Sequence, residues 1–340
     1  MHFGQSAYLV DEYWPEFDRY ISSTRREADL LCLPIDGRRF RKSNYSWTTD
    51  GFSHVKQSPS VVCYRSYQLR KLAAQGAARQ RGLLAFSERL ADHFASFLTY
   101  ETTHLVVMQS LLPFLWLGGH LGGRTFDVLM TRLPLADLHH TLDQAYRLHP
   151  ESKTLADFRA GDLLVNAETE ALREARKIIT PHSMVAATFP HKAELIAWTT
   201  PEAPRQLKTQ HTTELHLIFP AATVARKGAY ELRAALQGSD AQLTIVGPVL
   251  EDAGFWRGVR IKHASATENW LESANAVVLP AFVEHRPARL LQSLAGGIPV
   301  IASTACGLEN MKGVTSVEAG DVESLRTAIN GLRSNAEGVG

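Results

Sequence analysis

One stretch of the chain, Ala276 to Gly307, alternates short apolar runs with a polar loop and a helical pattern. Its first apolar run, Ala276 to Pro280, is too short for a helix and rich in β-branched residues, so it predicts a buried parallel strand. A second run, Ile298 to Ala302, closes the stretch and predicts the next strand. Parallel neighbours need a crossover connection, which is usually a helix. The stretch therefore restricts the chain to folds in which helices connect parallel strands.

The residues between the two runs supply this crossover. Pro287 suits the first helical position, because its missing N–H would be unpaired there. Apolar residues then recur at helical spacing on one face, namely Leu290, Leu291, Leu294 and Ala295. Gly296-Gly297 supplies a left-handed stop. The polar loop Val283 to Arg286 precedes the helix at the carboxyl end of a strand, where open α/β sheets bind ligands, and the free N–H groups of the helix favour an anion.

The rest of the chain continues the alternation of apolar runs and helical patterns. The predicted strands are Gln5 to Val10, Ala28 to Leu33, Ser60 to Tyr64, His104 to Met108, Phe126 to Thr131, Lys177 to Thr180, Leu215 to Phe219, Leu243 to Gly247 and Val259 to His263. The predicted helices are Trp14 to Thr24, one or two within Leu69 to Tyr100, Leu135 to Tyr146, Ala167 to Arg176, Tyr230 to Leu236 and Glu268 to Ala274. This order predicts α/β architecture with helices on both faces of parallel sheets.

The length of 340 residues exceeds that of one ordinary domain and suggests two. The segment from Thr199 to Thr213 is polar, contains prolines and lacks periodicity, which is typical of a linker. We therefore predict an N-terminal domain over residues 1–200, a linker over 201–213 and a C-terminal domain over 214–340.

Charge and cysteine content exclude some classes of function. The charges of the 36 basic and 35 acidic residues nearly cancel, so the net charge predicts no strong positive potential that would attract nucleic acid. The cysteines Cys32, Cys63 and Cys306 are odd in number and far apart, which fits a reducing cytoplasm and gives no metal-binding spacing. Residues 1–10 lack the basic start and apolar core of a signal peptide.

Two segments bear on membrane contact. The apolar window Leu105 to Leu121 contains a glutamine, a proline and a histidine, so it predicts a strand followed by a buried helix rather than a membrane span. The cluster Arg38 to Lys42 is basic and precedes Tyr45 and Trp47. It is interpreted as a solvated loop, and the alternative is peripheral contact with a membrane surface or an anionic acceptor.

Part of the C-terminal half resembles glycosyltransferase family 4, whose members are retaining enzymes of the GT-B fold. The resemblance rests on Glu284 with the short helix after it, Ala295 to Ala302, Gly307-Leu308, Lys227-Gly228 within Leu215 to Ala235, Leu243 to Gly247, and a closing strand and helix within Val314 to Ile329. The N-terminal half matches the family only in its alternation of predicted strands and helices. The resemblance implies two Rossmann-like, doubly wound domains facing a cleft. No Asp-x-Asp sequence supports a metal-dependent arrangement, and no metal or cofactor is expected.

The resemblance implies cations for the diphosphate of a nucleotide-sugar donor. Charge builds on the leaving phosphates during transfer, and a fixed cation stabilises it. Lys227 matches the family's phosphate-binding lysine, and a solvated loop lysine is the alternative. Ala222 stands where the family has an arginine. Arg226 and Arg286 are candidates to replace that arginine, because a guanidinium grips phosphate through a planar fork.

Further residues of the donor site follow from the same resemblance. Glu284 would accept hydrogen bonds from the donor sugar, although a carboxylate before a helix also stabilises the helix end. Gln292 stands where the family has a ribose-binding glutamate, and its amide oxygen can still accept a hydrogen bond. The segment His285-Arg286-Pro287-Ala288 is expected beside the donor, with Pro287 removing one N–H that could hold phosphate. Gly247 leaves room for a base, and His263-Ala264 would hold its edge through the main chain.

The acceptor is expected in the N-terminal domain. Arg132 stands at the place where the family often has a histidine facing the donor sugar, and His104, His120 and His182 are other options. The resemblance thus implies a metal-independent, retaining hexosyltransferase that uses a glycan, lipid or small-molecule acceptor. Two rivals remain, a binding or scaffold protein that has lost catalysis and a GT-B enzyme that hydrolyses or epimerises a nucleotide sugar.

Overall fold

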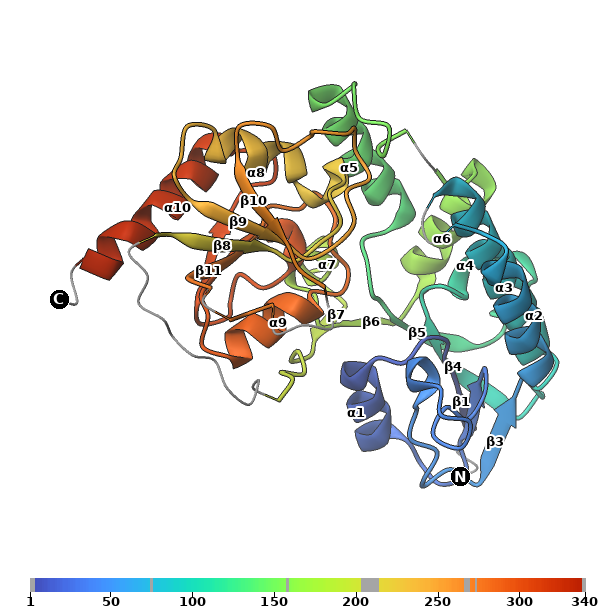
Figure 1. The fold of residues 1–340 in the computed structure, drawn as a ribbon. Helices are drawn as coiled ribbons and strands as arrows, with labels where there is room; N and C mark the ends of the chain where they lie inside the picture. Colours follow the sequence, from blue (N-terminus) through green and yellow to red (C-terminus); the bar gives the residue numbers. More distant parts are fainter. Residues whose placement is uncertain are drawn as a thin grey trace. The chain divides into compact units, whose positions relative to one another are not determined.

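The structure is a computed structural model that describes residues 4–73, 76–156, 159–202, 214–265, 270–272 and 274–337. It contains two compact units, each built on one parallel sheet (Figure 1). Unit 1 comprises Met1–Ala136, Phe158–Pro181 and Val185–Thr199, and unit 2 comprises Asp137–Asp157, His182–Met184 and Thr200–Gly340. Residues 137–157, expected in the N-terminal domain, thus group with the C-terminal sheet. The expected linker lies outside the described residues except for positions 201 and 202.

The sheet of unit 1 has seven strands in the order β3-β2-β1-β4-β5-β6-β7, and every pair is parallel. The strands are β1 Gln5–Leu9, β2 Leu30–Leu33, β3 His54–Gln57, β4 Thr102–Met108, β5 Thr125–Leu129, β6 Lys177–Thr180 and β7 Ala193–Leu195. The carboxyl halves of the central strands β1, β4 and β5 are continuously buried, because helices cover both faces of the sheet. The strand order reverses between β1 and β4, which creates a switch point at the carboxyl edge of the sheet.

Helices cover this sheet on two sides. Figure 1 shows α1 on one side and α2, α3 and α4 on the other. The helices are α1 Pro15–Thr24, α2 Pro59–Arg70, α3 Ala77–Ala95, α4 Leu112–Leu117 and α6 Asp162–Glu174, with α7, Ser183–Thr188, following β6. Phe17, Leu90 and Leu115 are fully buried against the strands, so the apolar stripe of each helix faces the core.

One predicted strand of unit 1 is wrong. Residues 60–64 lie in α2, and the strand before them is β3. Pro59 occupies the first turn of the helix, where proline is favoured, and Val62 is the buried residue of α2. Strand β3 lies at the sheet edge and alternates exposed and half-buried residues, so no apolar run marks it. The three-residue strand β7 at the other edge was not predicted either.

The apolar window Leu105 to Leu121 behaves as predicted. It forms most of β4 and the short helix α4, and Leu105, Leu112 and Leu115 are fully buried. Within the described parts of the chain, no helix combines the length and the apolar character needed to cross a membrane. The basic cluster Arg38 to Lys42 is exposed at every position.

The sheet of unit 2 has six parallel strands in the order β10-β9-β8-β11-β12-β13. They are β8 His216–Phe219, β9 Gln242–Ile245, β10 Arg260–His263, β11 Ala276–Leu279, β12 Val300–Ser303 and β13 Val314–Val317. Helix α8, Ala229–Leu236, packs with α10, Val322–Glu337, whereas α9, Ala288–Ala295, lies on the other side (Figure 1). Helix α5, Leu135–Leu148, belongs almost wholly to this unit.

The predicted strands of the C-terminal half are confirmed, as is the crossover from β11 through α9 to β12. Gly297 adopts the expected left-handed conformation, with φ of +75°. The strand order reverses between β8 and β11, so the loops after β8, β9 and β11 meet at one edge. The helix expected at 268–274 falls partly on residues outside the description.

Candidate functional site at the carboxyl edge of unit 2

An ion pair joins the loops that follow β8 and β11. The Lys227 Nζ donates to Glu284 Oε2 at 2.9 Å and to the Val283 carbonyl at 2.8 Å. The other carboxylate oxygen, Glu284 Oε1, accepts from the Arg286 N–H at 2.9 Å. The Lys227 and Glu284 side chains keep 19% and 15% of their surface exposed, so a ligand can reach both. Two residues implied by the resemblance are therefore in direct contact.

The local sequence explains why the two loops meet. Lys227 ends the short 3-10 turn Ala225–Lys227, and Gly228 after it has φ of +75°. A Cβ at Gly228 would lie 2.1 Å from the carbonyl oxygen of Pro280, so only glycine permits this approach. The Arg226 carbonyl accepts from the N–H groups of Phe282 and Val283, at 3.0 and 3.2 Å. Lys227-Gly228 thus fixes the cation against the β11 loop.

Glu251 braces the same 3-10 turn from the opposite side. Its Oε1 accepts from the Ala225 N–H at 3.0 Å, from Thr154 Oγ1 at 2.6 Å and from Ser152 Oγ at 2.9 Å. Its Oε2 accepts from the Tyr230 hydroxyl at 3.2 Å. Residues 152 and 154 follow α5, so the segment inserted from the N-terminal half holds the lysine loop. No sequence pattern indicated this contact, because Glu251 lies in a loop without a motif.

Arg289 is a further cation at this edge, and sequence reasoning missed it. Its NH1 donates to the carbonyls of Pro220 and Val246, at 2.7 and 2.6 Å, which follow β8 and β9. Burial lowers the pKa of the guanidinium from its usual value. Ala222, where a family arginine was expected, lies two residues from Pro220. A helical pattern could have indicated Arg289, because it shares the polar face of α9 with Gln292 three residues later.

His182 supports the Glu284 loop from below. Its Nε2 donates to the carbonyls of Glu284 and Ala305, at 3.1 and 3.2 Å. Burial lowers the pKa of this imidazole, so the neutral ring is favoured. Gly307 has φ of +65°, and a Cβ there would lie 2.5 Å from His182 Nδ1. His182, predicted as an option on the acceptor side, therefore packs against the Glu284 loop and positions it.

The other residues predicted at the donor site lie in the loops of unit 2 and at the start of α9. Gly247 follows β9, and a Cβ there would lie 2.7 Å from the Ala222 N, so the glycine permits close packing of the two loops. His263 ends β10 and is exposed, and the Ala264 N–H donates to the Ile245 carbonyl at 3.0 Å. Helix α9 begins at Ala288, one residue later than predicted, with Pro287 as its N-cap. The half-buried residues of this set are Arg226, His285 and Gln292, and Arg286 is exposed.

Two acceptor-side candidates of unit 1, Arg132 and His104, have ion-pair partners within the unit. Arg132 NH2 pairs with Glu168 Oε1 at 2.9 Å, and Glu168 is fully buried. Glu168 also accepts from Gln109 Nε2 at 3.2 Å. His104 lies near the amino end of β4, 3.3 Å from Asp127, and so at the edge opposite the switch point. His120 follows α4 and is half-buried.

Asp11 is a buried carboxylate at the carboxyl edge of unit 1. It follows β1, accepts from Ser110 Oγ at 3.2 Å and lies 3.7 Å from Arg65 NH1. Its other oxygen, Oδ1, has no hydrogen-bond partner among the described residues. Burial raises the pKa of Asp11 to about 6, against the lowering effect of Arg65. The residue was not predicted, because a single aspartate after a strand carries no motif.

We expect Asp11→Asn to remove a pH-dependent cost of folding. The folded pKa lies above the unfolded value, so the stability linked to Asp11 is present at low pH and is lost as the pH rises through 6. One pKa unit corresponds to about 1.4 kcal/mol. Between pH 4.5 and 7.5 the asparagine variant should therefore gain about 2 kcal/mol in free energy of unfolding relative to the parent, as measured by urea denaturation. A difference that stays constant with pH would contradict this expectation.

Comparison with protein families places the matched segment over unit 2. Residues 221–335 match the family model described as glycosyl transferases group 1, which is about a third of the chain. The matched segment includes Lys227, Glu284 and Arg289. No match was found among curated proteins.

Solved structures show the fold of the whole chain. Sucrose-phosphate synthase from Thermosynechococcus elongatus aligns with a TM-score of 0.57 at 13% identity, over 98% of this chain and 90% of that one. Anabaena Alr3699/HepE in complex with UDP aligns with a TM-score of 0.52 at 14% identity, over 98% and 94%. The chain spans about half of TarM, covering 75% of itself and 52% of that chain at 13% identity and a TM-score of 0.48. The predicted GT-B fold, with two parallel α/β units, is confirmed.

Proposed function

We propose that this protein is a retaining glycosyltransferase that moves a hexose-like sugar from a nucleotide-diphosphate donor to a glycan, lipid or small-molecule acceptor. The observation that carries the proposal is the Lys227–Glu284 pair at the switch point of unit 2. The family match over residues 221–335 supports sugar transfer, and HepE binds UDP on the same fold. The three free cysteines fit a reducing cytoplasm.

The site supplies the two kinds of group that transfer needs. Lys227 and Arg289 bring positive charge to the carboxyl edge, where the leaving diphosphate gains charge, so the proposed reaction requires no metal. Glu284 accepts hydrogen bonds from sugar hydroxyls, and its contact with Lys227 keeps sugar and diphosphate adjacent. In a retaining reaction on the front face of the donor, the leaving phosphate takes the acceptor proton. No separate protein base is then required.

The alternative function is that of a glycosyltransferase-like binding or scaffold protein that has lost catalysis. Its support is the set of altered donor positions, Ala222, Pro287 and Gln292. Calorimetric titration with UDP, GDP, ADP and TDP, without added metal, decides between the two. Binding of one nucleoside diphosphate with a Kd in the micromolar range supports the transferase and identifies the base. Absence of binding by all four would overturn the proposed donor site and leave the scaffold.

Arg289 should contribute to diphosphate binding in this site. Arg289→Gln removes the charge but keeps a polar side chain that can reach the strand-end carbonyls. A hydrogen bond to a charged group contributes about 1.5–3 kcal/mol, so affinity for the nucleoside diphosphate should fall about 10- to 100-fold, with the matching nucleoside unaffected. Arg260→Gln, at an exposed position on β10, is the control. Equal losses for nucleoside and diphosphate would show that Arg289 only holds the loops together.

A further inference from the structure

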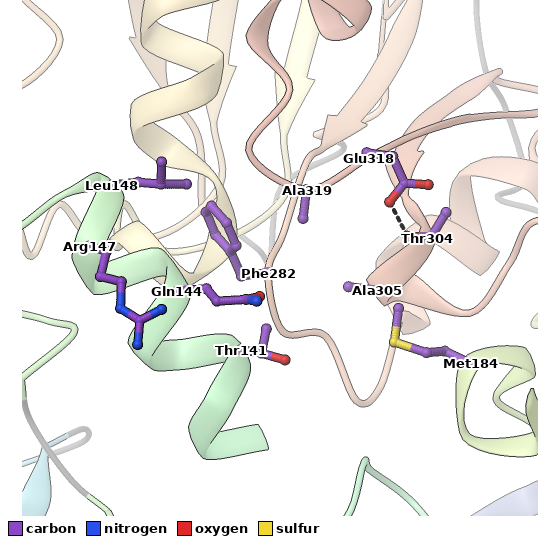
Figure 2. A pocket seen from close by; sticks show the side chains of 10 residues that line it. All are labelled: Thr141, Gln144, Arg147, Leu148, Met184, Phe282, Thr304, Ala305, Glu318 and Ala319. Atoms are coloured by element: carbon purple, nitrogen blue, oxygen red, sulfur yellow. Dashed lines mark hydrogen bonds between the residues drawn. The ribbon is translucent and has the colours of Figure 1, made fainter. Parts of the chain in front are cut away.

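Unit 2 contains a cavity of about 480 Å³, and its lining includes Phe282, which lies two residues before Glu284. Small-molecule sites are typically about 300–1,000 Å³, so the cavity has the size of a ligand site. Figure 2 shows helix α5 on one side of it and the loops after β12 and β13 on the other. Thr141, Gln144 and Leu148 line it from α5, at the spacing of one helix face.

The cavity carries one charge of each sign. Arg147 lines it from α5 and Glu318 from the loop after β13. Glu318 Oε2 accepts from Thr304 Oγ1 at 3.4 Å, which directs the carboxylate along the wall (Figure 2). Within the described residues, neither Arg147 nor Glu318 has an ion-pair partner at salt-bridge distance. A phosphate would be repelled by Glu318, and an acyl chain would strip water from both charges, so neither fits the cavity.

Apolar surface completes the lining. Phe282 and Met184 face the cavity, and Leu148 keeps 56% of its surface exposed there. Gly320 keeps this space open, because a Cβ at that position would lie 3.2 Å from Leu148 Cδ1 and 3.5 Å from Phe282 Cε1. A ligand with an apolar face and a polar edge therefore matches the surface.

We propose that this cavity binds a neutral sugar ring of the acceptor. A sugar hydroxyl both donates and accepts, and the cavity offers a guanidinium that only donates, a carboxylate that only accepts and the Gln144 amide that does both. The C–H face of the ring packs on Phe282 and Leu148. The ligand class is thus a neutral hexose or N-acetylhexosamine unit.

The position of the cavity supports an acceptor rather than a remote ligand. Phe282 precedes Glu284 by two residues, and two extended residues span at most about 7 Å. His182 Nε2 also joins the carbonyls of Glu284 and Ala305, and Ala305 lines the cavity. A sugar bound here would lie close to the carboxylate proposed to hold the donor sugar. This inference therefore rests on the proposed transferase function.

Ligand-observed saturation-transfer NMR on the full chain tests the inference with glucose, galactose, mannose and N-acetylglucosamine as probes. We expect at least one sugar to bind with a Kd of about 1–10 mM, which corresponds to a single weak site. Gln144→Ala and Glu318→Gln should each weaken that binding about 10-fold. Tyr146→Ala, an exposed position on α5 outside the cavity, is the matched control and should bind as the parent does.

Competition with a nucleoside diphosphate tests whether the sugar cavity is distinct from the donor site. Sugar binding should persist when the diphosphate is saturating, and Gln144→Ala should leave diphosphate affinity unchanged. Absence of binding by all four sugars, displacement by the diphosphate or equal binding by the variants would overturn the sugar cavity alone. Failure of every nucleoside diphosphate to bind would instead overturn the proposed function.

Discussion

Glu284→Gln should slow sugar transfer about 100- to 1,000-fold at saturating donor, while affinity for the free nucleoside diphosphate changes less than about threefold. Glutamine preserves the size of the side chain and an oxygen that can accept from the Arg286 N–H, as Glu284 Oε1 does at 2.9 Å. The variant lacks the negative charge that strengthens the proposed hydrogen bonds to the donor sugar in the transition state. Removing one preorganised electrostatic contact typically costs such a factor in kcat.

Two measurements check this expectation, kcat with donor and acceptor saturating and calorimetric affinity for the free diphosphate. Glu323→Gln, in the first turn of α10 and paired with Arg326, controls for loss of a carboxylate elsewhere in unit 2. Equal losses of turnover and diphosphate affinity would contradict a role toward the sugar. They would show instead that Glu284 mainly shapes the loop around the phosphates.

Lys227→Ala should weaken nucleoside diphosphate binding about 10- to 100-fold and leave the matching nucleoside unaffected. The lysine provides a charge-assisted hydrogen bond of about 1.5–3 kcal/mol to phosphate. The alanine variant also leaves the Glu284 carboxylate without the partner it has at 2.9 Å. Part of the loss could therefore come from repulsion between that carboxylate and the diphosphate, rather than from the missing cation.

A double-mutant cycle separates the two contributions. If repulsion by Glu284 dominates, the Lys227→Ala/Glu284→Gln double variant should recover most of the affinity. If Lys227 contacts the phosphate directly, the double variant should bind as weakly as Lys227→Ala alone. Lys312→Ala, at an exposed position of unit 2, is the control for removing a lysine. Unchanged diphosphate affinity in Lys227→Ala would remove this residue from the donor site.

The predicted strands differed in accuracy because burial differs between strands. Strand β11 is buried at every position, so its side chains form a continuous apolar run that sequence alone reveals. Strand β3 lies at an edge and alternates exposed with half-buried residues, so the apolar run at 60–64 gives the stronger strand signal although it lies in α2. Pro59 was the local signal that this run begins a helix.

Sequence patterns predict the β11-α9-β12 unit and the general position of a ligand edge, and the family resemblance predicts a role for Lys227-Gly228. These depend on local patterns, such as apolar periodicity, a glycine at positive φ and a proline at a helix start. Contacts across the chain depended on the tertiary structure. Lys227 meets Glu284 across 57 residues, and His182 meets the Glu284 carbonyl across 102. Such distances follow from strand order and helix packing, which bring loops together regardless of their separation in sequence.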